Sequence, residues 1–414
     1  MQKGERVGIY SPNRVEWTVL QLATAMIDVI LVNVNPAFQA HELEFCLQKV
    51  GVKTLVMDSR FKKSDYIKIV QSLIPDLDKQ DRRNLKISSL PDLKQIVLIP
   101  EEEQVKGMLN FCDFYKLHDQ RLVQALRERE AQVDCHSPTN IQFTSGTTGF
   151  PKAATLTHHN VLNNGRLTAE RLHYTHRDVL VTPVPLYHCF GMVLGNLAIL
   201  SNGGTLVYPS PSFEPKATLD AIFEEKATSL YGVPTMFLDL MDLAKKEGRK
   251  PTTLRKGIVA GSLVPEPIYK RIILELGING LTSCYGMTET SPTSFQNHMD
   301  DEFAQKTSSV GLVHPFVEAK VVNDKFEVVP RNTPGELWTK GYLRMQGYWC
   351  DEEKSRECMT EDGWMRTGDI GIINDKGYLK IDGRIKDMII RGGENISPKE
   401  VEEFYLHHPD IFDC

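Results

Sequence analysis

The residues with the clearest capacity for chemistry form the segment TSGTTGFPK at positions 144–152. Within nine positions it combines two glycines, four hydroxyl side chains and a lysine, directly after the strand-like run IQFT. Glycines let backbone N–H groups close on an anion, hydroxyls add donors and lysine adds positive charge. We therefore predict a phosphate cradle, with a Ser/Thr/Gly-rich surface loop as the alternative. It is not a Walker A loop, because Pro151 precedes the lysine, which does not follow G-x-x-x-x-G. The predicted cradle residues are Thr144, Ser145, Gly146, Thr147, Thr148, Gly149 and Lys152.

The elements that must position this loop alternate between short apolar runs and helical segments. Strand-like runs lie at 7–10, 29–34, 54–58, 141–144, 178–184, 205–209, 229–233 and 256–261, and helical segments at 15–25, 41–50, 158–172 and 215–226. Continuous apolar strands that alternate with helices are typical of parallel sheets covered on both faces. This predicts an α/β fold up to about residue 309. The charged, irregular stretch 62–134 is predicted to be an exposed excursion from that fold.

Beyond residue 309 the helical pattern ends, and short strands are expected at 318–323, 325–330, 335–341 and 377–383, separated by turn residues. These predict a small antiparallel β unit over about 310–382. Only 27 residues follow the composition shift at 383–387, too few to bury a core. We therefore expect an N-terminal core over 1–382, then a hinge and an incomplete C-terminal domain over 383–414.

Composition excludes several classes of protein. The 414 residues carry 48 Lys+Arg against 54 Asp+Glu, a net charge of −6 without long blocks of one sign, so no nucleic-acid partner is expected. No apolar stretch approaches the 18 or so residues of a transmembrane helix. The eight cysteines form no C-x-x-C pair, and we interpret them as reduced and mostly buried. The first residues contain neither a signal peptide nor a transit segment, and no sequence feature fixes the oligomeric state.

The cradle is the first of five segments that resemble, in order, the motifs of the adenylate-forming superfamily, which includes acyl-CoA synthetases, peptide-synthetase adenylation domains and luciferases. The other four are YGMTETSP at 285–292, GELW at 335–338, RTGDIG at 366–371 and GRIKDMIIRGGENISPKEVE at 383–402. GERVGIYSPN at 4–13 and VNVNP at 32–36 resemble the family's N-terminal strands, so the resemblance spans essentially the whole chain. PVPLYHC at 183–189 and the hinge segment favour the acyl-CoA synthetase branch, and within it the mitochondrial medium-chain ligases.

The resemblance implies a role for each matched residue. Tyr285 would face adenine, Glu289 would hold Mg²⁺, Asp369 would accept the ribose hydroxyls and Arg384 would contact the nucleotide. Taken alone, Glu289 fits a solvated loop carboxylate, Asp369 fits a turn residue and Arg384 fits an exposed ion pair. The implied nucleotide contacts also include Gly261, Ser262, Gly286 and Thr288, and the implied catalytic residues are Lys152, Thr288, Glu289 and His188.

His188 would lie between the acyl tunnel and the nucleotide, whereas a lone histidine on an apolar stretch is usually a core residue. YGVPTMF at 231–237 resembles the acyl-pocket segment. Lys386 matches the hinge, and Gly392 and Gly393 match the loop that serves thioester formation.

The resemblance implies a two-step ligase that uses ATP, Mg²⁺ and CoA. ATP and a medium-chain fatty acid would give an acyl-adenylate and pyrophosphate, and CoA would then take the acyl group. Two departures from the family pattern bear on this activity. Ala153 stands where the family commonly has glycine, which would add a methyl beside the phosphates. The family's C-terminal lysine has no match beyond the hinge, where only Lys399 occurs, and the family extends upstream of residue 4.

From the missing lysine we expect ATP binding to survive and adenylate formation to be slow. Two alternatives remain open at this point. One is a non-catalytic nucleotide or acyl binder, and the other is an adenylating enzyme with an acceptor other than CoA.

Overall fold

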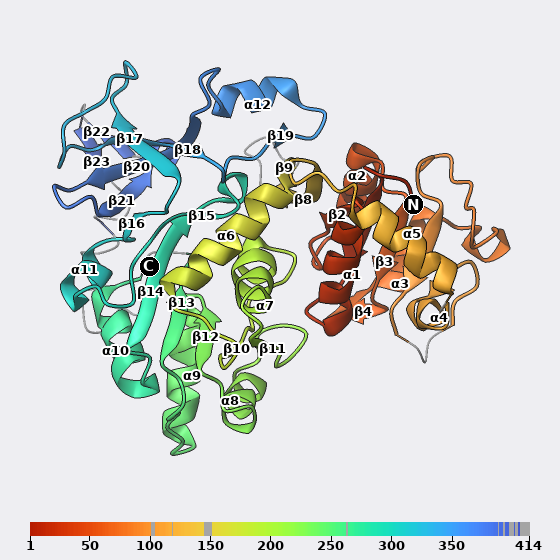
Figure 1. The fold of residues 1–414 in the computed structure, drawn as a ribbon, viewed down its shortest axis with the longest axis horizontal. Helices are drawn as coiled ribbons and strands as arrows, with labels where there is room; N and C mark the ends of the chain where they lie inside the picture. Colours follow the sequence, from red (N-terminus) through yellow and green to blue (C-terminus); the bar gives the residue numbers. More distant parts are fainter. Residues whose placement is uncertain are drawn as a thin grey trace.

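The computed structural model describes residues 1–100, 104–117, 119–144, 151–261, 264–387, 389–391, 394–396, 401 and 405, with backbone only for 389–391 and 394–396. Three sheets organise these residues (Figure 1). The N-terminal elements form one lobe, α6 to α10 flank the second sheet, and the later strands lie over one end of it.

The first sheet has eight strands, and its six consecutive strands from β8 to β7 are parallel. Its central strands are buried on both faces, as continuous apolar runs require, and Ile9, Leu31 and Leu55 are almost fully buried. The strand order is β19 (Gly347–Tyr348), β9 (Lys152–Thr157), β8 (Pro138–Thr144), β2 (Ile30–Asn33), β1 (Arg6–Tyr10), β3 (Thr54–Met57), β6 (Gln95–Leu98) and β7 (Leu109–Asn110). Its helices are α1 (Val15–Met26), α2 (Ala40–Val50), α3 (Tyr66–Leu73), α4 (Phe111–Tyr115) and α5 (Gln120–Glu130).

The second sheet has seven strands, parallel from β11 to β14 and antiparallel at β15 and β16. The order is β11 (Thr205–Val207), β10 (Val179–Val181), β12 (Ser229–Gly232), β13 (Lys256–Val259), β14 (Gly280–Gly286), β15 (Thr293–Gln296) and β16 (Leu312–Val313). Its helical elements are α6 (His158–Arg171), the π-helical η2 (Phe190–Leu197), α7 (Ala198–Leu200), α8 (Pro215–Glu224), α9 (Pro234–Lys246), α10 (Glu266–Leu276) and α11 (Phe303–Ser308). Thr157 and Asn160 form a capping box that starts α6 directly after β9.

The third sheet is antiparallel, with the order β17 (Val317–Val322), β18 (Gly335–Gly341), β20 (Met365–Ile373) and β21 (Leu379–Arg384). Helix α12 (Glu352–Cys358) and the 3₁₀ turn η4 (Ile385–Asp387) adjoin it. The smaller elements are β4 (Arg60–Phe61), β5 (Ser64–Asp65), η1 (Leu77–Lys79), η3 (Thr288–Thr290), β22 (Ile389–Arg391) and β23 (Glu394–Ile396).

The predicted α/β architecture and the antiparallel unit after residue 309 are confirmed, but the prediction for 62–134 is wrong. That stretch supplies β6 and β7 to the first sheet, and Leu77, Leu85 and Leu90 are buried against it. These leucines are spaced without helical or strand periodicity, so their burial has no simple pattern in the sequence. The parallel pairing of β3 with β6 makes the segment part of the core.

The strand predicted at 325–330 is also wrong. Only an isolated bridge joins Val322 to Val328 there. Asn323 Oδ1 accepts the backbone N–H groups of Lys325 and Glu327, which turns the chain instead of extending it.

The seven described cysteines are free thiols, as expected, but fewer are buried than predicted. Cys46 and Cys189 are buried, Cys135 and Cys350 are exposed and the rest are intermediate. No helix among the described residues has the length and apolarity needed to span a membrane.

A buried ion pair joins three strands of the second sheet. Asp178 precedes β10 and is about 1 % exposed, and its Oδ2 lies 3.0 Å from Lys256 Nζ on β13. Thr228, before β12, donates its hydroxyl to Asp178 Oδ1 at 2.9 Å, and Arg255 Nη2 contacts the same oxygen at 2.9 Å. Burial alone would raise the pKa of Asp178, but the hydrogen bonds from Lys256, Thr175 and Thr228 outweigh it and hold the pKa below its usual range.

His314 makes the stability of this fold dependent on pH. It is fully buried, its Nε2 lies 3.1 Å from Gln296 Oε1, and burial together with Arg171 and His298 lowers its pKa well below the ordinary value. In the unfolded chain the same ring takes up a proton as the pH falls through about 6.5, so the unfolded state binds more protons and is favoured. We expect this residue to remove about 1.4 kcal/mol of unfolding free energy per pH unit below that value.

Urea unfolding of wild type and His314→Gln at about pH 7.5 and about pH 5.5 measures this dependence. The variant should lose less stability over that interval, and His176→Gln, at an exposed position, should behave like wild type. Equal pH dependence in wild type and His314→Gln would contradict the assignment.

Candidate functional site

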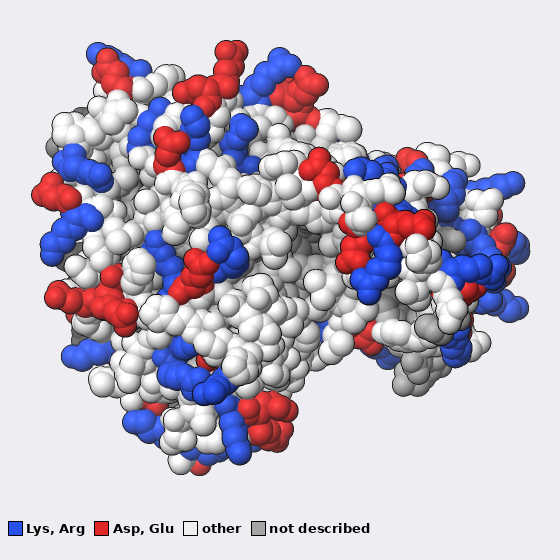
Figure 2. Space-filling view, viewed as in Figure 1, with Lys and Arg blue, Asp and Glu red and all other residues white. Residues whose placement is uncertain are grey.

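Four of the predicted site residues lie at the carboxyl ends of parallel strands, which is where ligands bind in open α/β sheets. Thr144 ends β8, Gly261 follows β13 and Tyr285 and Gly286 end β14. Only glycine fits at position 286, because a Cβ there would lie 1.7 Å from the carbonyl oxygen of Pro292. Figure 2 shows basic and acidic side chains interspersed over the visible face, and a mostly uncharged hollow between the lobe of N-terminal elements and the rest of the molecule.

Tyr285, Asp369 and Arg384 are brought together although they are far apart in the sequence. The hydroxyl of Tyr285 donates to Asp369 Oδ2 at 2.5 Å, and Arg384 Nε lies 3.2 Å from Asp369 Oδ1. Asp369 and Arg384 are register partners in the β20–β21 ladder, which explains how the ion pair forms. The Asp369 side chain is 10 % exposed and that of Arg384 is 71 % exposed. Burial raises the pKa of Asp369, with Tyr285 and Arg384 opposing the rise.

A second group connects Glu289, Tyr348 and Lys152. The Tyr348 hydroxyl donates to Glu289 Oε1 at 2.7 Å, and Lys152 Nζ lies 5.0 Å from the centre of the same ring. Burial and the Glu289 carboxylate raise the pKa of Tyr348, so its hydroxyl stays protonated. Lys152 pairs with Thr144 across the β8–β9 ladder, so the two ends of the predicted cradle face each other.

Tyr348 is a candidate site residue that sequence reasoning missed. It lies on β19, a strand of two residues whose antiparallel pairing with β9 places it opposite Ala154. A two-residue strand leaves no periodic signal, and only the sheet register reveals the contact. In the sequence, the only feature that marks the position of Tyr348 is the run Gly347-Tyr348-Trp349.

Ala153 does not lie where the sequence analysis expected it. It is a residue of strand β9, about 1 % exposed, and it packs in the hydrophobic core beneath the first sheet. Its methyl group therefore fills core space, and regular strand backbone suits alanine as well as glycine.

Glu289 and Thr288 offer an oxygen donor set that fits Mg²⁺. Both are buried in η3, one with a carboxylate and one with a hydroxyl. Among the described residues, Glu289 belongs to no cluster of three or more potential ligands from histidine, cysteine, aspartate and glutamate. Mg²⁺ typically binds one or two carboxylates and keeps waters and substrate phosphates as its other ligands.

His188 lies in the loop between β10 and η2. His188 is exposed, but the protein around its ring removes part of its hydration and lowers its pKa below the ordinary value. The backbone N–H of Phe190 donates to its Nδ1 at 3.1 Å, which leaves the proton of the neutral ring on Nε2. His188 can therefore offer an N–H donor at neutral pH.

Apolar space lies close to the η2 helix. A cavity of about 160 Å³ is lined by Met192 and Leu197 of η2 together with side chains of α1, α6 and the first sheet. On the other side of η2, Phe190 stacks on Tyr231 of β12 at 5.7 Å. Val233 follows β12, and its Cγ1 would lie 3.1 Å from a Cβ on Gly261, so the predicted acyl and adenine segments adjoin each other.

Eight predicted contacts lie outside the described residues and stay predictions: Ser145, Gly146, Thr147, Thr148, Gly149, Ser262, Gly392 and Gly393. The predicted hinge residue Lys386 is described, and it lies exposed in η4 directly after β21.

Comparisons with known proteins agree with this arrangement. The family described as AMP-binding enzyme matches residues 1–349. The medium-chain acyl-CoA ligase ACSF2, mitochondrial, of Mus musculus is 44% identical over 99% of this chain and 68% of its own length. The anthranilate CoA ligase AuaEII, solved with anthranoyl-AMP, superposes with a TM-score of 0.84 at 22% identity, over 100% of this chain and 74% of that one. ATP-bound MatB from Rhodopseudomonas palustris superposes with a TM-score of 0.79 at 25% identity, over 100% and 75% of the two chains.

Proposed function

Because the chain belongs to the AMP-binding enzyme family, we propose that it is an ATP-dependent carboxylic acid–CoA ligase that works through an acyl-adenylate. The observation that carries this proposal is a pair of contacting side-chain groups that begin from one segment, since Tyr285 ends β14 and Glu289 lies in η3 just after it. Tyr285, Asp369 and Arg384 form a nucleoside-binding group. Glu289, Tyr348 and Lys152 form a phosphate-binding group.

The nucleoside-binding group of residues binds the ribose through Asp369. Its carboxylate is oriented by Tyr285 and Arg384, and a charged acceptor can take hydrogen bonds from both ribose hydroxyls. Asp369→Ala should weaken Mg-ATP binding by about 10- to 100-fold, since a hydrogen bond to a charged group contributes about 1.5–3 kcal/mol. Calorimetric titration with Mg-ATP measures the change. Asp382→Ala, on the same strand as Arg384, is the matched control and should leave affinity unchanged. Equal affinity in Asp369→Ala and wild type would refute the ribose role.

The phosphate-binding group of residues neutralises charge on the triphosphate. Lys152 supplies a cation next to the predicted cradle, and Tyr348 holds the Glu289 carboxylate in place. Mg²⁺ bound by Glu289 and Thr288 would neutralise phosphate oxygens. Glu289 is buried, and its hydrogen bond to Tyr348 fixes its orientation before the nucleotide arrives.

The acid substrate is a medium-chain fatty acid. We place its carboxylate near His188, whose Nε2–H can donate to a carboxylate oxygen, and its alkyl chain in the apolar region beside η2. The mouse relative is named a medium-chain ligase, which supports this substrate class. We further propose that CoA is the acceptor and that residues 383–414 follow the core as a hinge and part of a second domain. We also propose that the protein acts in mitochondria, which the names of its ACSF2 relatives support.

Acid-dependent pyrophosphate release with CoA present tests the substrate class. Each buried CH₂ contributes about 0.8 kcal/mol, so octanoate should reach half-saturation at a concentration at least 100-fold below that of acetate. If acetate or an amino acid is the better substrate, the chain belongs to another class of adenylating enzyme.

A further inference from the structure

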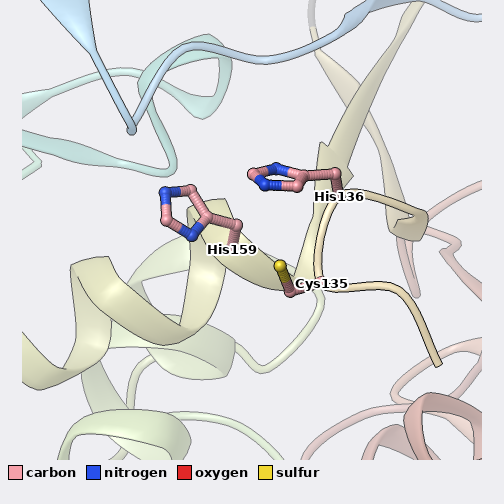
Figure 3. Close-up of side chains that lie close together, drawn as sticks. All are labelled: Cys135, His136 and His159. Carbon is pink, nitrogen blue, oxygen red and sulfur yellow. The ribbon is translucent and has the colours of Figure 1, made fainter.

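Outside the nucleotide site, three metal-ligating side chains converge at the base of the β8–β9 hairpin. Cys135 and His136 precede β8, and His159 is in the first turn of α6 (Figure 3). One ligand atom from each residue lies within 4.8 Å of the others. Among the described residues this is the one such group of three from histidine, cysteine, aspartate and glutamate.

The hairpin itself causes the convergence. Pro138 and Thr157 are partners at the open end of the β8–β9 ladder, so the residues just before β8 and just after β9 must be neighbours. The backbone N–H of His159 donates to the carbonyl of Cys135 at 2.8 Å, which locks the two segments together. Gln346 Nε2 donates to the carbonyl of His136 at 2.8 Å and connects the segment that leads to β19. The three side chains are thus held by backbone that is already ordered by the sheet.

We propose that Cys135, His136 and His159 form a binding site for a divalent transition metal ion, with Zn²⁺ as the ion that the donor set fits best. One thiolate and two imidazoles are borderline-soft ligands, which select Zn²⁺ over Mg²⁺ or Ca²⁺. The site is therefore chemically distinct from the oxygen donors of Thr288 and Glu289.

Closing this group around an ion requires small side-chain movements. Bonds of about 2.0–2.3 Å to a tetrahedral Zn²⁺ bring ligand atoms to about 3.3–3.7 Å from one another. In the structure the ligand atoms lie within 4.8 Å of one another, so this largest separation exceeds that of a closed site by about 1.1–1.5 Å. Cys135 and His136 are exposed and have room to rotate. The ring centres of His136 and His159 are 5.0 Å apart. Asn163 Nδ2, one turn further along α6, lies 3.1 Å from His159 Nδ1, and a metal ion bound at Nδ1 would replace this contact.

Three protein ligands leave a fourth position for water or an external group. An ion at this site would join the segment before β8, the strand that leads into the predicted cradle, to α6, which follows the strand that leaves the cradle. Two contacts connect its ligands to the segment that carries Tyr348. Gln346 donates to the carbonyl of His136, and the ring of His159 meets that of Tyr342 edge-on. Metal binding is thus expected to raise the melting temperature of the whole chain.

The test uses the purified full chain, stripped of metal and kept reduced, with Zn²⁺ alone as ligand in calorimetry and Co²⁺ alone as the spectroscopic probe. Wild type should bind one equivalent of Zn²⁺ with a rise in melting temperature, and its Co²⁺ form should show a thiolate-to-cobalt absorption band. Cys135→Ser, His136→Asn and His159→Asn should each weaken Zn²⁺ binding at least tenfold, and Cys135→Ser should abolish the band. Cys350→Ser and His176→Asn, which change exposed residues elsewhere, should retain both properties.

Melting curves without metal show whether each variant is folded, and the exposure of Cys135 and His136 makes their replacement mild. A Co²⁺ complex without the thiolate band would overturn the proposal. So would Zn²⁺ affinity in folded Cys135→Ser or His136→Asn equal to that of wild type. Neither result depends on ligase activity, so the outcome is independent of the proposed function.

Discussion

Replacing Lys152 with methionine is expected to lower kcat for acyl-adenylate formation by about 100- to 1000-fold, the usual effect of losing one preorganised charge stabiliser. Lys152 joins the predicted cradle to β9, and its ammonium group lies over the Tyr348 ring beside Glu289. Negative charge builds up on the oxygens around the α-phosphorus as the carboxylate attacks, so the cation matters more in the transition state than in the ground state. Single-turnover formation of the adenylate from saturating Mg-ATP and octanoate measures the effect.

Lys320→Met is the matched control for this substitution. Lys320 also lies over aromatic rings, 4.8 Å from the centre of Trp338 and 4.2 Å from that of Trp364, but on the third sheet. It should change kcat less than twofold. If Lys152→Met and Lys320→Met are equally active, the charge at Lys152 has no part in the reaction.

Replacing Lys256 with methionine is expected to lower the free energy of unfolding by about 3 kcal/mol, the lower end of the range for breaking a buried ion pair. Asp178 would keep its buried charge but lose the ammonium group 3.0 Å from Oδ2. Arg255 and Thr228 would remain on Oδ1, which is why the loss stays at the lower end. Urea unfolding at neutral pH measures the change, provided that the transition is two-state.

Arg255→Met tests whether burial decides the effect. Its side chain is 51 % exposed, whereas that of Lys256 is 9 % exposed, although both contact Asp178. The exposed partner should contribute about 1 kcal/mol or less. The double variant Asp178→Asn with Lys256→Met should be more stable than the sum of the two single effects predicts, because no unpaired charge remains. Equal losses from Arg255→Met and Lys256→Met would contradict this account.

The sequence predicted most of the parallel strands because apolar runs such as 29–34 and 256–261 are buried on both faces, and this burial removes the alternation that marks a surface strand. It failed where order depends on distant partners. The sequence predicts an exposed excursion where β6 lies, because the charged stretch around 79–84 dominates this region and the buried leucines follow no period. Tertiary pairing with β3 overrides that local signal.

The candidate site divides in the same way. The motifs pointed to Tyr285, Asp369 and Arg384, and the structure brings these three into contact through the β20–β21 register. Tyr348 and the Cys135–His159 neighbourhood could not be predicted, because each depends on which strands pair. Cys135 and His136 are adjacent, but His159 lies 23 positions beyond His136, so the three residues form no metal-binding pattern along the chain.

The most direct test of the central claim follows the fate of ATP labelled in its α-phosphate when the purified chain is incubated with Mg²⁺ and octanoate, before and after CoA is added. The account predicts octanoyl-AMP and pyrophosphate in the first stage, then octanoyl-CoA and AMP once CoA is present. At a subsaturating ATP concentration both stages should be slower in Asp369→Ala, in line with its weaker ATP binding. An adenylate that persists in the presence of CoA would mean that the acceptor is a different nucleophile. ATP that binds but gives no adenylate with any carboxylic acid would contradict the ligase assignment and leave a nucleotide-binding protein.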